Sequence, residues 1–194
     1  MQEVKIKRNW VEDSAAYAKA VTVTNVDAYK KRGQSNAQKI EQQNMNGKIA
    51  ELVAYSYLSG KLPDLSTPDL NVYTARKKNW DKDLKSKYGS FGVKSQTMVE
   101  KTLYGESWVF QNEDTGIFED TTDDNYVVLV LLDLKELKGY IKSIVKVKWL
   151  LENKLFKPMK LIHLKSKKAV YFSDLEKYGE EIWQLQTALT KITG

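Results

Sequence analysis

The clearest helical pattern in the chain begins near Ser35 or Asn36 and ends at Gly60. Apolar side chains recur there at helical spacing, at Ile40, Met45, Ile49, Leu52, Val53, Tyr55 and Leu58. Such spacing is typical of an amphipathic helix, and a glycine often follows the last turn of a helix. The pattern therefore predicts one long helix, with Glu51 close to its apolar stripe. Residues 1–25 mix a short alternating segment with an alanine-rich stretch and predict no firm element.

Strand patterns dominate the middle of the chain. After a loop marked by two prolines, the sequence predicts strands at 70–73, 80–85, 90–98 and 107–111, with a tight turn at Tyr88-Gly89 between the second and the third. The run from Tyr126 to Leu132 is apolar at every position, which is typical of a central strand covered on both faces. We expect this run to be the core strand.

The C-terminal third continues the sheet and then returns to a helix. Alternation over 140–148 indicates a strand, followed by a short helical piece near Leu150. Residues 161–164 and 169–172 read as a hairpin with a polar turn. An amphipathic helix is expected from Leu175 to Ile192, capped by Ser173 or Asp174.

Together these elements predict an α/β fold with a mixed central β-sheet flanked by helices. No repeat or compositional linker divides the 194 residues, so a single domain is expected. Its core would span about 36–132, and about 133–194 would form a C-terminal extension with the hairpin and the helix. The acidic stretch 113–124 between two of the strands is expected to be a solvated loop.

Composition excludes several kinds of site. The chain has no cysteine and one histidine, His163, so thiolate metal sites, cysteine nucleophiles and most histidine-centred hydrolases are excluded. His163 lies in an apolar strand pattern and is expected to be structural. A formal charge of +6 favours a polyanionic partner, although such a charge also serves solubility. No apolar run is long enough for a membrane span or a signal peptide, and a cytoplasmic protein is expected.

Asp83 and Lys94 form the most informative polar pair. If 80–85 and 90–98 form a hairpin, Asp83 lies on the strand next to Lys94. Side chains alternate along a strand, so Gly92, Lys94 and Gln96 share one face. Carboxylate oxygens hold divalent cations, and a lysine beside the metal can position a water or stabilise a phosphate. The pattern favours phosphodiester hydrolysis.

These residues resemble the PD-(D/E)XK nuclease superfamily, which has the restriction-endonuclease-like fold. Asp83 resembles the motif aspartate, Val93-Lys94-Ser95 the end of the acidic-hydrophobic-lysine strand, and Glu51 in Gly47-Lys48-Ile49-Ala50-Glu51 the helical glutamate of several branches. The resemblance covers roughly 45–132 and implies a DNA endonuclease that uses Mg²⁺, or Mn²⁺ in its place. It implies that Glu51 and Asp83 hold the metal and that Lys94 assists the attacking water.

Contacts with DNA are expected from basic and polar side chains around this site. We assign them to Lys48, Arg76, Lys77, Lys78 and Ser95. Two sites of cleavage often require two subunits, so a homodimer is compatible with this function. Trp108 could stack on a base, but a tryptophan in a strand is expected to be core.

Gly92 departs from the family pattern, because it stands where an acidic residue precedes the lysine by two positions. Either Gln96 or Glu51 completes the site, or the site is inactive. The alternative function is therefore a nucleic-acid-binding module of the same fold without catalysis. Structural roles stay open for each residue: Asp83 as an exposed charge, Glu51 on the helix surface, and Gln96 as a partner of the backbone. A protein-interaction domain is a third hypothesis.

Overall fold

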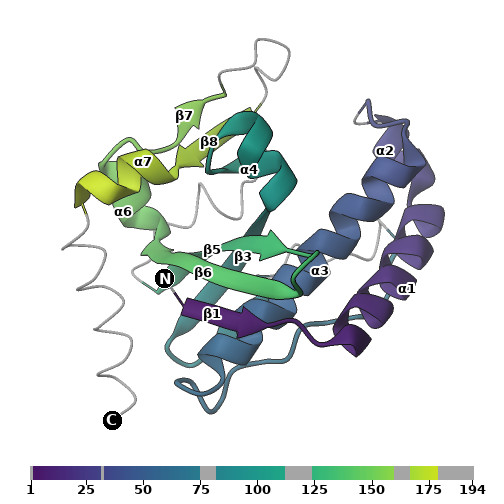
Figure 1. Ribbon diagram of the computed structural model, residues 1–194, viewed down its shortest axis with the longest axis horizontal. Coiled ribbons are helices and arrows are strands. Elements are labelled where there is room, and N and C mark those ends of the chain that lie inside the picture. Colours follow the sequence, from purple (N-terminus) through teal and green to yellow (C-terminus); the bar gives the residue numbers. More distant parts are fainter. Residues whose placement is uncertain (1, 32, 75–81, 112–123, 160–166, 179–194) are drawn as a thin grey trace.

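A five-stranded mixed sheet forms the centre of the protein (Figure 1). The structure is a computed structural model that describes residues 2–31, 33–74, 82–111, 124–159 and 167–178. The sheet has the order β1-β6-β5-β3-β2, and its β3 and β5 are parallel while the other neighbours are antiparallel. Its strands are β1 (Gln2–Lys5), β2 (Leu84–Ser86), β3 (Gly89–Thr97), β5 (Asn125–Asp133) and β6 (Lys138–Lys146). The predicted α/β class with a mixed central sheet is confirmed.

Helices and a second sheet cover the two faces of this central sheet. The helices are α1 (Arg8–Thr24), α2 (Val26–Lys31), α3 (Ala37–Leu58), α4 (Met98–Tyr104), α6 (Val147–Glu152) and α7 (Phe172–Leu175), followed by a 3-10 helix at Glu176–Tyr178. The second sheet has the order β4-β8-β7, with β4 (Ser107–Gln111), β7 (Lys157–Pro158) and β8 (Lys167–Tyr171). Figure 1 shows α3 behind the central sheet with α1 beside it, and the second sheet on the side of α4, α6 and α7.

The position of β5 between two apolar clusters explains why its sequence is apolar at consecutive positions. Tyr126, Val128 and Val130 belong to an apolar cluster with α3, whereas Val127 and Leu129 belong to a second cluster with Trp108 of β4 and other residues of that layer. Every residue from 125 to 132 is buried. The prediction of a core strand covered on both faces is confirmed. The strand lies between two apolar layers, one on each face of the central sheet.

The long helix α3 packs closely against β6. Asn36 caps its first turn by accepting a hydrogen bond from the Lys39 amide at 3.0 Å, in agreement with the predicted start. At Gly139 of β6 an added Cβ would lie 2.6 Å from Cγ2 of Val53, so only glycine allows the helix to approach this far. This contact determines how far Glu51, two residues before Val53, lies from the sheet.

The predicted strand at 70–73 is wrong. These residues have no regular secondary structure, and their three apolar side chains are 37% to 42% exposed. Asp69 instead accepts hydrogen bonds from the main-chain and side-chain nitrogens of Asn71, at 2.8 and 2.7 Å. The Tyr73 carbonyl accepts one from Asn25 at 2.9 Å. Hydrogen bonds with side chains thus take the place of strand pairing in a segment that alternation alone would assign to a sheet.

The predicted strand 90–98 ends one residue early because a capping box begins α4. Thr97 Oγ1 accepts a hydrogen bond from the Glu100 amide at 3.2 Å, and Glu100 Oε2 accepts one from the Thr97 amide at 2.8 Å. Residues 84–86 form the regular part of the preceding strand. Two elements that lie outside 36–132, β1 and β6, are also part of the central sheet.

The strand and the short helical piece predicted for the C-terminal third are confirmed, but the predicted start of the last helix is wrong. Helix α7 begins at Phe172 and ends at Leu175, and its N-cap is Tyr171 without a side-chain hydrogen bond, so the predicted cap at Ser173 or Asp174 does not form. The strand over 140–148 corresponds to β6, and the helical piece near Leu150 to α6. Positions 161–164 of the hairpin and most of the predicted C-terminal helix lie outside the described residues. In the described ranges no helix has the length and apolar character needed to cross a membrane.

Candidate active site

Glu51 is a buried carboxylate on α3, with 8% of the residue exposed. Its Oε2 lies 2.6 Å from Nζ of Lys48, one turn earlier on the same helix. The Lys48 ammonium also lies 4.9 Å from the ring centroid of Tyr17 on α1. An isolated buried carboxylate would be unfavourable, so this ammonium stabilises the charged form of Glu51 in the interface between the two helices.

The pKa of Lys48 reports the charges around it. Burial favours the neutral amine, but the Glu51 carboxylate outweighs burial, and Tyr17 and Asp83 act in the same direction with smaller effect, so the pKa is raised. Burial also favours the neutral form of the Tyr17 hydroxyl and therefore raises its pKa. The charge of Lys48 opposes this rise, and the charges of Glu51 and Asp69 add to it. These groups therefore form one electrostatic cluster.

Asp83 joins this cluster to the central sheet. It lies directly before β2, and its Oδ2 accepts a hydrogen bond of 2.7 Å from the main-chain nitrogen of Val93 on β3. Its charge also acts on Lys48 of α3. The predicted place of Asp83 on the strand is wrong, because β2 begins only at Leu84. Its carboxylate is nevertheless bound to the main chain of β3, the strand of Lys94.

Lys94 points to the other face of the central sheet. Its ammonium lies 5.3 Å from the ring centroid of Phe110, which belongs to the apolar cluster on the side of the second sheet. The preceding residue, Val93, packs against the cluster of α3. The predicted alternation along β3 is confirmed, and it directs Lys94 away from the α3 layer that contains Glu51. Gly92 is buried beside it.

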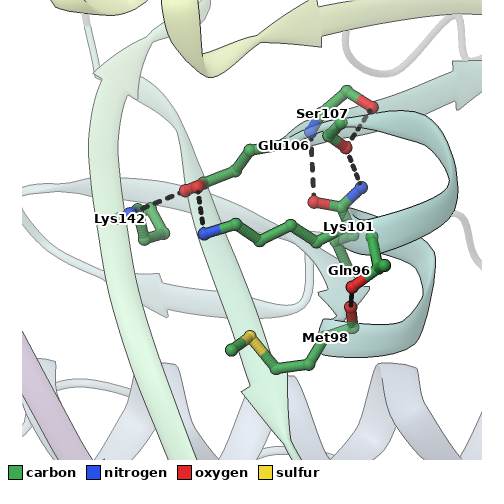
Figure 2. A network of polar contacts seen from close by, with 8 residues as sticks. Gln96, Met98, Lys101, Glu106, Ser107 and Lys142 are labelled. Carbon is green, nitrogen blue, oxygen red and sulfur yellow. Dashed lines mark hydrogen bonds and ion pairs between the residues drawn. The ribbon is translucent and has the colours of Figure 1, made fainter.

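Gln96 is bound to the backbone of the segment between α4 and β4 (Figure 2). Its Nε2 donates to the Gly105 carbonyl at 2.7 Å, and its Oε1 accepts from the Ser107 amide at 3.1 Å. The residue is only 4% exposed. Both ends of the amide therefore hold this corner of the fold, which is the structural role considered for Gln96 from the sequence.

The other predicted residues are placed as follows. Ser95 is half-buried and follows Lys94 on β3. Trp108 is fully buried, and its Nε1 donates to the Val130 carbonyl at 3.0 Å, which confirms its assignment to the core. Positions 76–78, with their three basic residues, and His163 lie outside the described residues.

Sequence reasoning missed three polar residues that take part in the charge clusters of the structure: Tyr17, Asp69 and Glu106. Tyr17 lies in an alanine-rich stretch without motif character, and the exposed Asp69 directly precedes the predicted strand 70–73. Glu106 pairs with Lys101 and Lys142, each at 2.7 Å (Figure 2). Burial opposes ionisation, but both lysines outweigh it and lower the pKa of Glu106. Tyr17 and Glu106 are marked by contacts with residues far along the chain, Lys48 and Lys142, which sequence spacing does not contain.

The carboxylate oxygens of Glu51 and Asp83 are suitable ligands for a magnesium ion, but they are few. In the described part of the chain, no group of three or more His, Cys, Asp or Glu side chains is arranged to hold a metal. Magnesium in proteins is often bound through one or two carboxylates with waters completing its shell. Glu51 and Asp83 are two carboxylates whose charges both raise the pKa of Lys48. They could hold such an ion if Lys48 left Glu51.

Comparisons with protein-family models, with curated proteins and with solved structures found no match for this chain.

Proposed function

We propose that this chain is a metal-dependent endonuclease that hydrolyses phosphodiester bonds of DNA on a restriction-endonuclease-like core. The observation that carries the proposal is the buried carboxylate of Glu51 on α3, whose Oε2 lies 2.6 Å from the Lys48 ammonium. The Asp83 carboxylate, directly before β2, is bound to the main chain of β3, and its charge adds to the rise in the pKa of Lys48. The order of the elements also supports it, with a helical glutamate, an aspartate before a strand, a turn and a strand with a lysine.

In this proposal the chain positions charge around one phosphate group. Glu51 and Asp83 hold Mg²⁺, or Mn²⁺ in its place, and the bound ion would lower the pKa of a water and neutralise phosphate charge. The Val93 amide fixes the orientation of the Asp83 carboxylate. Both carboxylates are attached to packed elements, which favours a preorganised site.

In this proposal Lys94 would supply a positive charge to the phosphate or to the attacking water, which requires its ammonium to leave Phe110 and reach past the edge of β3 toward Asp83. In the structure its ammonium lies over Phe110, a contact that contributes about 0.5–2 kcal/mol. Hydrogen bonds to charged groups contribute about 1.5–3 kcal/mol, and the lysine stem is flexible. A phosphate bound next to Asp83 would therefore attract the ammonium away from the ring.

A plasmid-cleavage assay with Mg²⁺ or Mn²⁺ tests the function. The variants Glu51→Gln, Asp83→Asn and Lys94→Met should each lose cleavage, while Glu136→Gln, an exposed acid between β5 and β6, should cut like the wild type. Circular dichroism should show that the variants are folded. Cleavage that is unchanged in both Asp83→Asn and Lys94→Met would overturn the assignment.

Two observations favour a second candidate, a nucleic-acid-binding module without catalysis. Gly92 is buried where the family pattern has an acid, and Lys48 is paired with Glu51. The positive charge of the chain then serves DNA binding alone. This candidate predicts that DNA affinity falls steeply with salt and is the same in EDTA as in Mg²⁺, and that no strand is cut.

A further inference from the structure

The Lys48 ammonium occupies one of the two carboxylate oxygens through which Glu51 could bind a divalent cation. Lys48 Nζ and Glu51 Oε2 are 2.6 Å apart, and the two side chains are 12% and 11% exposed. Tyr17 lies against the same ammonium. Two cations at this distance in a poorly solvated site repel each other strongly. Metal and ammonium therefore cannot share this carboxylate oxygen.

We propose that Lys48 is a built-in counter-ion that competes with the divalent cation for Glu51 and thereby sets the metal affinity of the site. This inference rests on the proposed function, because it assumes that Glu51 is a metal ligand. In the metal-free protein, Lys48 compensates the buried charge of Glu51. When metal binds, Lys48 leaves the carboxylate, and a phosphate group of the substrate can accept its charge.

The contacts of Lys48 suit such an exchange. Its partner on the same helix is only three residues away, so the ion pair forms without help from a distant segment. The lysine stem can rotate at its four carbons, whereas α3 is held against β6 at Val53 and Gly139. The ammonium can therefore move while the carboxylate stays in place.

Calorimetric titration of the full chain with Mn²⁺, without DNA, tests the proposal. Lys48→Met keeps the length of the side chain and removes its charge, so the dissociation constant for Mn²⁺ should fall by about tenfold to a hundredfold, the range expected for one charge-assisted hydrogen bond. Lys48→Arg keeps the charge and should bind within a few-fold of the wild type. A matched control is Lys61→Met, because the Lys61 ammonium also lies over a tyrosine ring, 5.3 Å from the ring centroid of Tyr57, but in the turn that follows α3. It should bind Mn²⁺ like the wild type.

A second variant leaves the charge of Lys48 in place. Tyr17→Leu removes the aromatic face that lies against the ammonium, a contact that contributes about 0.5–2 kcal/mol depending on its exposure to solvent, so Mn²⁺ should bind about two- to thirtyfold more tightly. This variant keeps the test decisive if Lys48→Met does not fold. Thermal unfolding adds a further readout, because Mn²⁺ should raise the Tm of Lys48→Met more than that of the wild type.

The outcomes separate this inference from the proposed function. Tighter Mn²⁺ binding by Lys48→Met and Tyr17→Leu, lost when Glu51→Gln is added, would support both. Mn²⁺ binding that requires Glu51 but is equal or weaker in the two variants would overturn the role of Lys48 and leave the metal site standing. An absence of Mn²⁺ binding in every variant would overturn the proposed metal-dependent function and this inference with it.

Discussion

The close approach of α3 to β6 makes Gly139→Ala a sharp test of the packing that positions Glu51. An added Cβ would lie 2.6 Å from Cγ2 of Val53, 2.7 Å from Cγ1 and 3.2 Å from Cβ. Val53 is fully buried, so its methyl groups have no solvent to move into. Overpacking of this kind costs about 1–3 kcal/mol. Gly139→Ala should therefore lower the free energy of unfolding by that amount.

Urea denaturation followed by circular dichroism measures this change, and a double-mutant cycle identifies its cause. Val53→Ala removes the two methyl groups that the new Cβ meets, at a cost of about 2 kcal/mol of its own. In that background Gly139→Ala should cost close to nothing, which gives a coupling energy of about 1–3 kcal/mol. The control is Gly47→Ala in α3, where no atom lies within 4 Å of an added Cβ and stability should rise by about 0.5–1 kcal/mol.

The reasoning would be refuted if Gly139→Ala destabilised the protein equally with and without Val53→Ala. That result would mean that the strand, and not the contact with α3, requires the glycine. The position of Glu51 relative to the sheet would then need another explanation.

Two further variants test polar contacts of the interior. Glu106→Gln leaves Lys142, whose side chain is 9% exposed, without its carboxylate, and should lower the free energy of unfolding by about 2 kcal/mol at pH 7. Because the pKa of Glu106 is lowered from 4.5, its stabilisation is complete above that pH and is lost as the pH falls through the lower folded pKa. The urea midpoints of wild type and variant should converge from pH 7 to pH 3, and a constant gap would contradict the ionic origin. Trp108→Phe removes the donor to the Val130 carbonyl and should cost about 1–3 kcal/mol by the same urea assay, whereas an unchanged midpoint would show that this hydrogen bond contributes little.

The sequence predicted α3 and β5 because each packs against apolar layers along most of its length. That packing requires apolar residues at regular helical spacing in α3 and at consecutive positions in β5. The segment 70–73 had the right alternation, but its hydrogen bonds go to Asp69 and Asn25 instead of a neighbouring strand. Which strand accepts a partner depends on the whole sheet, and alternation does not contain that information.

The candidate site was predictable in its residue types and less so in its geometry. The sequence indicated a contact between Asp83 and the strand of Lys94 but placed Asp83 on a strand that begins one residue later. Alternation correctly placed Gln96 on the face of Lys94. It contained no signal that this face turns toward Phe110 while Glu51 pairs with Lys48 in the layer of α3. The side of the sheet on which a helix packs is decided by tertiary contacts such as that of Val53 with Gly139.

The central claim is that Glu51 and Asp83 together hold a divalent cation, and a calorimetric titration with Mn²⁺ tests it most directly. The wild type and Glu136→Gln should bind the ion equally, and Glu51→Gln and Asp83→Asn should each weaken binding by about tenfold or more, because each removes a charged oxygen ligand. Equal Mn²⁺ affinity in the wild type and in both site variants would contradict the claim.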